Sequence, residues 1–234
     1  MLKVLRFLPL LLLLLAVLPG VVYAQPSSPT IFVLHAEGVI NPVLVDYIEH
    51  GIEQAEEDNA TACIIQLDTP GGLLDSTEEI VVAIMNADVP IIVYVSPKGA
   101  WAASAGVFIT LSAHIAVMTP GTTIGAAHPV SVGDTEISDD EMEKITNFSA
   151  KWMQTIADER GRNAEEAQLA VTESKSFTDT EALEYNLIDL RANTLDSLIS
   201  QIDGWQVTIG DGSTVTLSTQ DAVVEDIDMS AIER

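Results

Sequence analysis

One short segment of the chain has the composition expected around a catalytic nucleophile. Ser104 lies among alanine and glycine residues in Gly99–Gly106 (GAWAASAG), where the backbone of a substrate can approach closely. A helix beginning near this serine would add partial positive charge beside a forming anion. The same composition also suits a close contact between a helix and a sheet, and the residues alone leave both interpretations open. The segment is not the G-x-S-x-G elbow, because Ala102 occupies the position of its first glycine.

A second segment, Asp68–Gly72 (DTPGG), follows a run of apolar residues directly. The adjacent Gly71 and Gly72 leave their backbone N–H groups unshielded by side chains, and such groups can stabilise a developing oxyanion. An ordinary strand-to-helix turn would use the same glycine pair. Neither glycine-rich phosphate-binding motif is present in the sequence.

A serine nucleophile also needs a group that accepts its proton, either a histidine or a lysine kept neutral by burial. Lys144 precedes Ile145, where a predicted long helix would enter the core, and Lys151 lies seven residues further on nearly the same face. From the residues alone, a solvated Lys144 paired with Glu141 or Glu143 is the favoured interpretation. The carboxylates between Asp134 and Glu143 would raise the pKa of this lysine unless they point into water. His128 is the competing base.

The composition limits the classes of partner. The 234 residues include 35 acidic and 10 basic side chains, for a net charge of −25. This charge argues against binding nucleic acid, which is itself a polyanion. It also argues against binding to anionic lipid through clusters of lysine and arginine. The single cysteine, Cys63, excludes an internal disulfide and a cysteine-rich zinc site. Four histidines without ligand spacing disfavour a metalloenzyme, so no metal or other cofactor is expected.

Residues 1–24 have the pattern of a secretory signal peptide. Lys3 and Arg6 precede the apolar run Phe7–Leu18, and Val22-Tyr23-Ala24 supplies small residues at the two positions read by signal peptidase. Cleavage is therefore expected before Gln25. An uncleaved anchor is the alternative, although the apolar stretch is at the short end of what spans a bilayer. We expect an exported, extracytoplasmic protein at the membrane surface.

The rest of the chain alternates strand-like and helix-like segments, which predicts an α/β fold with a largely parallel sheet and crossover helices. Residues 25–218 are expected to form one domain that ends in a β-hairpin over Val207–Leu217, and 219–234 an acidic tail without clear periodicity. Ser131–Glu143 reads as an exposed acidic loop. Strands are predicted at Thr30–His35, Thr61–Leu67, Val89–Val95, His114–Met118 and Leu187–Leu190. Helices are predicted at Asn41–Asp58, Leu74–Ile84, Ala102–Leu111, Asp140–Arg160, Ala164–Glu173 and Thr180–Asn186.

Four motifs in order resemble the NfeD-type membrane-associated serine proteases, a ClpP/crotonase-like class related to signal peptide peptidase A. They are Asp68–Gly72, Ala102–Gly106, Pro120–Ala126 and Lys144–Asn147. The resemblance extends from about Thr30 to Leu217, and four motifs at suitable spacings are far more specific than any one of them.

The resemblance implies a Ser–Lys dyad with Ser104 as nucleophile and Lys144 as general base. It also implies an oxyanion hole from the N–H groups of Gly71 and Gly72, with Ala105 as a further candidate. His128 lies about where Clp-type relatives place their catalytic histidine, so it stays the alternative base. The implied substrates are apolar polypeptide segments, including one of a stomatin-like membrane protein, and the acidic loop would act as a lid. A homo-oligomer is expected.

The resemblance leaves two other functions to consider. A ClpP-like domain that binds a membrane-protein segment without cleaving it would use the same groove, because fold does not determine function. A crotonase-like acyl-CoA enzyme would need the oxyanion hole but not Ser104, and the export signal disfavours it. Longer family members continue into transmembrane helices and a small β-barrel, so this chain is expected to be a short form or a truncation.

Overall fold

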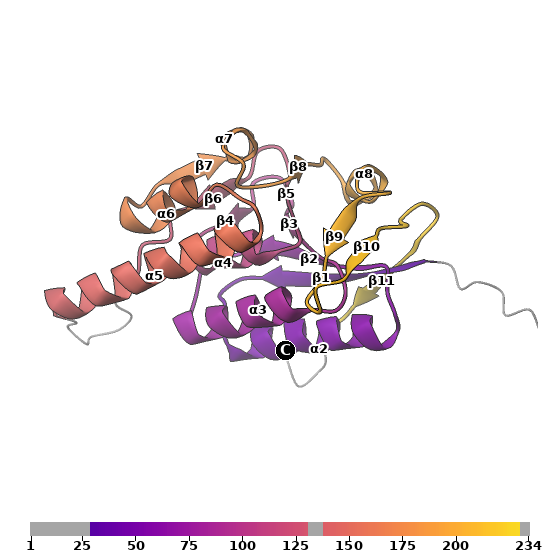
Figure 1. Cartoon of the computed structure of the whole chain (residues 1–234), viewed down its shortest axis with the longest axis horizontal. Helices are drawn as coiled ribbons and strands as arrows, with labels where there is room; N and C mark the ends of the chain where they lie inside the picture. Colours follow the sequence, from indigo (N-terminus) through magenta and orange to yellow (C-terminus); the bar gives the residue numbers. More distant parts are fainter. Residues whose placement is uncertain (1–28, 131–137, 230–234) are drawn as a thin grey trace, which may run out of the picture.

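The computed structural model describes residues 29–130 and 138–229, and its centre is a six-stranded sheet in which every pair of neighbours is parallel (Figure 1). The predicted signal peptide, 1–24, and the stretch 131–137 of the predicted acidic loop lie outside the described residues. In spatial order the strands are β11 (Val223–Ile227), β1 (Thr30–Glu37), β2 (Ala62–Asp68), β3 (Ile91–Val95), β5 (Ile115–Met118) and β8 (Leu190–Arg191).

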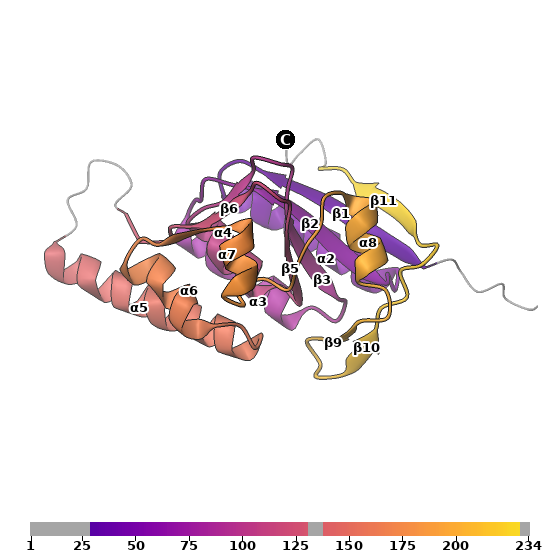
Figure 2. The same ribbon diagram turned by 90° about the horizontal axis from the view of Figure 1, so that it is seen from above.

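The sheet separates two hydrophobic cores, because successive side chains of a strand point to opposite faces. In β1, Phe32 and Leu34 enter the larger core, whereas Ile31 and Val33 enter the smaller one. The larger core is covered by α2 (Pro42–Glu57), α3 (Leu74–Asn86), α4 (Ala105–Ser112), α5 (Asp139–Glu159) and α6 (Ala164–Thr172). The smaller core is covered by α8 (Leu195–Gln201) and the antiparallel hairpin of β9 (Gln206–Thr208) and β10 (Thr214–Thr216) (Figure 2).

Side-chain caps explain where two of the helices begin. Asn41 accepts a hydrogen bond from the Leu44 N–H at the start of α2, as its position before Pro42 predicts. At the start of α5, Ser138 and Glu141 form a reciprocal capping box. These hydrogen bonds to Glu141 lower the pKa of its carboxyl group. The predicted α5 differs from the observed helix by one residue at each end.

A smaller sheet lies beside the central one and carries the segment that leads to Ser104. Its strands are β4 (Trp101–Ala102), β6 (Thr123–Gly125) and β7 (Ser176–Thr178), and α7 (Asp179–Glu184) follows β7. The pairing of β4 with β6 is parallel, and that of β6 with β7 is antiparallel. Because Trp101 and Ala102 pair as a strand, the helix predicted from Ala102 begins only at Ala105.

The carboxyl-terminal part of the sequence prediction needs two corrections. Residues 223–227 of the expected acidic tail form β11, which pairs with β1 at the edge of the central sheet. This edge strand buries few side chains, so apolar and polar residues do not alternate clearly in its sequence. It is held by backbone pairing and by the Tyr47 hydroxyl, which donates to the Ile227 carbonyl at 2.6 Å. The strand predicted at 187–190 is instead Leu190–Arg191, because Leu187 closes the end of α7 by donating to the Ala182 carbonyl.

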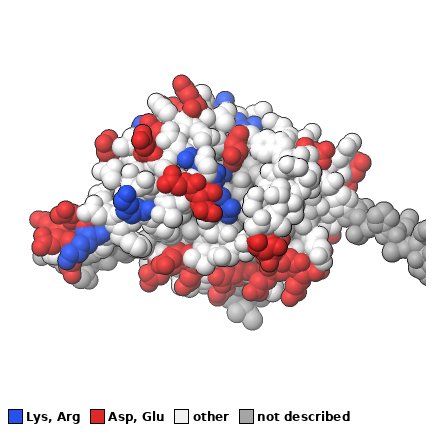
Figure 3. Space-filling model, in the orientation of Figure 1, with Lys and Arg blue, Asp and Glu red and all other residues white. Residues whose placement is uncertain are grey.

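Acidic side chains gather along the α2 and α3 side of the molecule and at the free end of α5 (Figure 3). Partial burial raises the pKa of Glu49 on α2, and the neighbouring carboxylates of Glu79, Asp46 and Glu53 raise it further. None of the helices within 29–130 and 138–229 is both long and apolar enough to cross a membrane.

Candidate active site

The turn after β2 and the segment before α4 are joined by a short ladder of hydrogen bonds. The Thr69 N–H donates to the Trp101 carbonyl at 2.8 Å, and the Ala103 N–H donates to the Thr69 carbonyl at 3.0 Å. The Asp68 carboxylate accepts a third bond, from the Trp101 N–H, at 3.1 Å. The ladder brings the DTPGG turn beside Ser104, although Gly72 and Ala103 are 31 positions apart in the sequence.

Ser104 occupies the N-cap position of α4 in an unusual backbone conformation, with φ +52° and ψ −111°. Non-glycine residues with positive φ are uncommon and cost free energy, and such strain concentrates at functional sites. The Ser104 N–H is held by the Ala126 carbonyl at 2.7 Å, while its side chain makes no capping bond to α4. The hydroxyl is therefore not committed to stabilising the helix.

Gly71 and Gly72 contribute to the site in different ways. A Cβ atom on Gly71, whose φ is +115°, would lie 2.5 Å from the Ser104 Cβ and 3.1 Å from its Oγ, so only glycine allows this approach. Its N–H already donates to the Thr69 hydroxyl at 3.0 Å. Within the described residues, the N–H groups of Gly72 and Ala105 have no hydrogen-bond partner. These two are the free donors near Ser104, and Gly71 supplies space rather than a free donor.

Ser104, Gly72 and Ala105 all line one apolar cavity of about 240 Å³. Its volume is of the order of one large side chain. The remaining lining residues are Leu73, Leu74, Thr77, Phe108, Ala127, Pro129, Val130, Ile145 and Ser149. The rim is hydrophobic as well, since Val130 is 73% exposed and Leu73 46% exposed. The site thus combines a serine, two free amide donors and an apolar wall.

The predicted base, Lys144, does not lie in this cavity. It is an exposed residue of α5, and the residues of that helix that line the cavity are Ile145 and Ser149, which are four apart on one face. Lys144 precedes Ile145 and therefore projects about 100° away around the helix. In this conformation Lys144 is not desolvated as expected. Its backbone is nevertheless next to the cavity wall, because the following residue, Ile145, lines the cavity.

His128, the alternative base, is anchored elsewhere. Its Nδ1 lies 2.9 Å from the Val171 carbonyl, which only accepts, so Nδ1 carries the proton of that bond. Like Lys144, it is not among the residues that line the cavity with Ser104. The structure therefore brings Ser104, Gly72 and Ala105 together and places both candidate bases outside their cavity.

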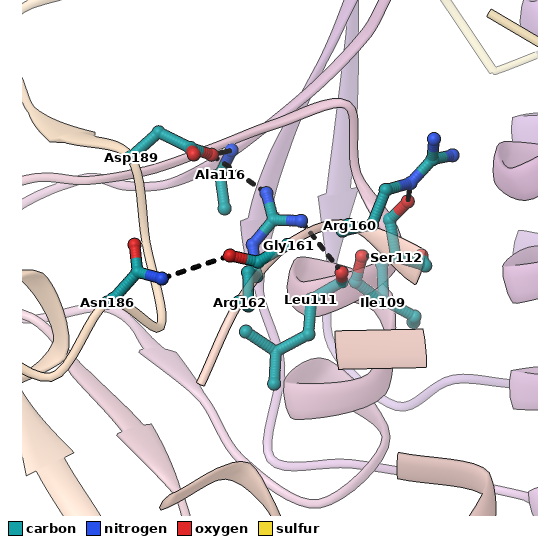
Figure 4. Close-up of polar contacts among 9 residues, drawn as sticks. All are labelled: Ile109, Leu111, Ser112, Ala116, Arg160, Gly161, Arg162, Asn186 and Asp189. Atoms are coloured by element: carbon teal, nitrogen blue, oxygen red, sulfur yellow. Dashed lines mark hydrogen bonds and ion pairs between the residues drawn. The ribbon is translucent and has the colours of Figure 1, made fainter. Parts of the chain in front are cut away.

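The other end of α4 is held by two arginines from the turn between α5 and α6 (Figure 4). Arg160 Nε donates to the Ser112 carbonyl at 2.7 Å, and Arg162 donates to the Leu111 carbonyl at 3.1 Å. Arg162 also pairs with Asp189 at 2.8 Å. Carbonyls at a helix end lack partners within the helix, so this cluster satisfies them and ties α5 to the helix that carries Ser104.

Two residues of the site were not predicted from the sequence. The Thr69 hydroxyl, fully buried, orients the turn by accepting from the Gly71 N–H. Ser149 lines the cavity from α5, and its hydroxyl has no partner within the described residues. Thr69 lies within a motif already singled out. Nothing in the sequence around Ser149 distinguishes it from other helical serines.

This fold and its serine at the start of a buried helix define a ClpP-like α/β domain. ClpP1 from Listeria monocytogenes superposes with a TM-score of 0.58 over 71% of this chain and 94% of that chain, at 20% identity, which is a likeness of fold. The chain belongs to the family described as NfeD1b, N-terminal domain, whose model matches residues 30–223.

Two curated proteins are similar over most of this chain. Membrane-bound protease PH1510 from Pyrococcus horikoshii is 37% identical over 211 residues, which cover 88% of this chain and 48% of that protein. Membrane protein NfeD1b from Bacillus subtilis is 25% identical over 196 residues, covering 84% of this chain and 41% of that protein. The chain spans about half the length, or less, of these relatives.

Solved structures of the archaeal domain resemble this chain in detail. The 1510-N membrane protease specific for a stomatin homolog, from Pyrococcus horikoshii, has a TM-score of 0.77 and 35% identity over 88% of this chain and 96% of that chain. A lysine-to-alanine mutant of the 1510-N membrane-bound stomatin-specific protease, in complex with a substrate peptide, has a TM-score of 0.81 and 35% identity over 88% and 95%. A serine-to-alanine mutant reaches 0.81 at 36% identity, over 87% and 100%.

Proposed function

We propose that this chain is a serine endopeptidase domain that cleaves apolar polypeptide segments, with Ser104 as nucleophile. The observation that carries the proposal is the arrangement of groups at the amino-terminal end of α4. A strained, uncapped Ser104 lies beside the free N–H groups of Gly72 and Ala105 at the wall of an apolar cavity. Donors placed where negative charge develops are the main requirement of acyl transfer, and each is worth about 3 kcal/mol in comparable sites.

In the proposed reaction, Ser104 Oγ attacks the carbonyl carbon of a peptide bond while Lys144 Nζ takes its proton. The Gly72 and Ala105 amides then bind the tetrahedral oxyanion. Return of the proton to the leaving amine breaks the C–N bond, and water releases the acyl-enzyme. To reach Ser104, the Lys144 side chain must extend past Ile145 toward the cavity. The proposal therefore includes a movement of the Lys144 side chain or of the first turns of α5.

The relatives support this assignment without testing these residues. Membrane-bound, stomatin-specific protease 1510-N shares the fold, and its serine-to-alanine and lysine-to-alanine mutants suggest the same pair of residue types. We therefore propose an exported enzyme at the membrane surface that acts on a segment of a stomatin-like protein and assembles as a homo-oligomer.

The position of Lys144 favours a second candidate function. An exposed lysine outside the cavity is what a binding module that holds an apolar segment without cleaving it would show. The two candidates differ in whether Ser104 is activated, because both need the groove and only the peptidase needs a reactive hydroxyl.

Labelling with a fluorophosphonate probe separates the two functions. The peptidase proposal expects covalent labelling of the purified protein and its loss in Ser104→Ala. The matched control is Ser112→Ala, since Ser112 lies at the opposite end of the same helix with its hydroxyl bonded to the Ile109 carbonyl at 2.9 Å. Absence of labelling in the unaltered protein, with an apolar peptide present and at several pH values, would favour the binding module.

A further inference from the structure

The Ser149 hydroxyl is buried in a helix and has no hydrogen-bond partner among the described residues. A serine or threonine inside a helix can donate to the carbonyl four residues earlier. Thr77, Thr110 and Thr155 do so, at 2.7, 2.7 and 3.0 Å. Ser149 makes no such bond, and no other group within the described residues bonds to its Oγ. The residue is only 1% exposed.

A buried hydroxyl without a hydrogen bond destabilises the fold unless another group bonds to it. Ser149 lies on the cavity face of α5, one turn beyond Ile145, and both residues line the cavity that contains Ser104. Thr77, another hydroxyl of this wall, is already committed to the Leu73 carbonyl. Besides Ser104, Ser149 is therefore the side chain lining this cavity in the described structure whose hydroxyl proton is not donated to another protein group.

We infer that Ser149 is a specificity-determining residue that hydrogen-bonds the polar end of the substrate side chain occupying this cavity. The apolar walls bind the body of that side chain, and the hydroxyl lowers the cost of burying an amide at its tip. The inference rests on the proposed peptide-binding role of the cavity. It implies that the site tolerates asparagine or glutamine next to the cleaved bond better than a wholly apolar pocket would.

The test compares peptides that differ only in the residue on the acyl side of the cleaved bond, in two nearly isosteric pairs, leucine with asparagine and methionine with glutamine. In Ser149→Ala, the ratio of polar to apolar kcat/KM should fall about tenfold in at least one pair, the effect of one lost hydrogen bond. Thr77→Val removes a hydroxyl that is already bonded, and it should leave both ratios within twofold. Ratios unchanged in Ser149→Ala would overturn the inference.

A binding measurement separates this inference from the peptidase proposal. Dissociation constants of the same peptides are measured in Ser104→Ala and in Ser104→Ala with Ser149→Ala, where no cleavage can occur. The inference is supported if the preference for the polar peptide, taken as a ratio of dissociation constants, is tenfold weaker in the double variant than in Ser104→Ala. This holds even if the unaltered protein cleaves nothing. Equal discrimination in both would overturn the inference alone. Failure of any peptide to bind at millimolar concentration would overturn both proposals.

Discussion

Gly71 packs against Ser104 so closely that a single added methyl group would lie 2.5 Å from the Ser104 Cβ. The contact joins the DTPGG turn to the start of α4 and sets how near the free amide of Gly72 comes to the serine. In the proposed mechanism, the spacing between the nucleophile and its oxyanion donors therefore depends on the absence of a side chain at Gly71. The Thr69 hydroxyl, which accepts from the Gly71 N–H, keeps the turn in this conformation.

Gly71→Ala should therefore impair both stability and the reactivity of Ser104. The alanine would be strained at φ +115° and would push against Ser104. We expect a loss of about 1–3 kcal/mol in the free energy of unfolding, from strain alone, together with a fall of at least tenfold in the labelling rate. Urea unfolding and fluorophosphonate kinetics provide the measurements. Gly204→Ala, at φ +77° with no atom nearby, is the matched control and should lose stability only.

Lys144→Ala should lower the labelling rate of Ser104 by two to four orders of magnitude, roughly the contribution of a general base. Lys151→Ala is the control, because Lys151 is an exposed lysine of the same helix, seven residues further on. His128→Ala should retain appreciable activity. If His128→Ala were the more damaging change, the site would be of the Clp type and the dyad assignment would be wrong.

Arg162→Met should destabilise the fold through the carboxyl end of α4. Arg162 is 6% exposed, and loss of its guanidinium deprives the Leu111 carbonyl and the Asp189 carboxylate of a donor. We expect a cost of about 2–4 kcal/mol, below that of a fully buried pair because the Asp189 side chain is 31% exposed. Equilibrium unfolding in urea measures it. Adding Asp189→Asn should recover part of the loss, and a strictly additive double variant would contradict the coupling.

Stability should fall as the pH is lowered from 6.5, partly because of His114. Burial, and then the charges of Arg160 and Arg162, lower its pKa from 6.5 to about 3. Between these values the unfolded chain binds a proton that the folded chain does not, so the free energy of unfolding decreases with falling pH by up to ~1.4 kcal/mol per unit. In His114→Gln the slope between pH 6.5 and 4.5 should be shallower than in the unaltered protein. His50→Gln, at an exposed histidine, is the matched control.

The regular elements were largely predictable because their signals are local. The helix predicted from Asn41 and the β-hairpin predicted over Val207–Leu217 are both confirmed, as α2 and as the pair β9–β10. β11 was missed because an edge strand is held by backbone pairing with β1, which leaves little pattern in its side chains. The roles of Ser104 and Lys144 stay predictions.

By itself the sequence indicated most strands of the central sheet and the helices from α2 to α7, since periodicity and caps depend on residues near one another. The candidate nucleophile and the ClpP-like class came from short motifs and their resemblance to a known family. Only the tertiary structure decided which amides near Ser104 are free, because the Gly71 N–H is taken by a neighbouring hydroxyl and those of Gly72 and Ala105 are not. It also placed Lys144 outside the cavity and Ser149 within its wall. Those properties depend on how α5 is rotated against α4, and packing between distant segments sets that rotation.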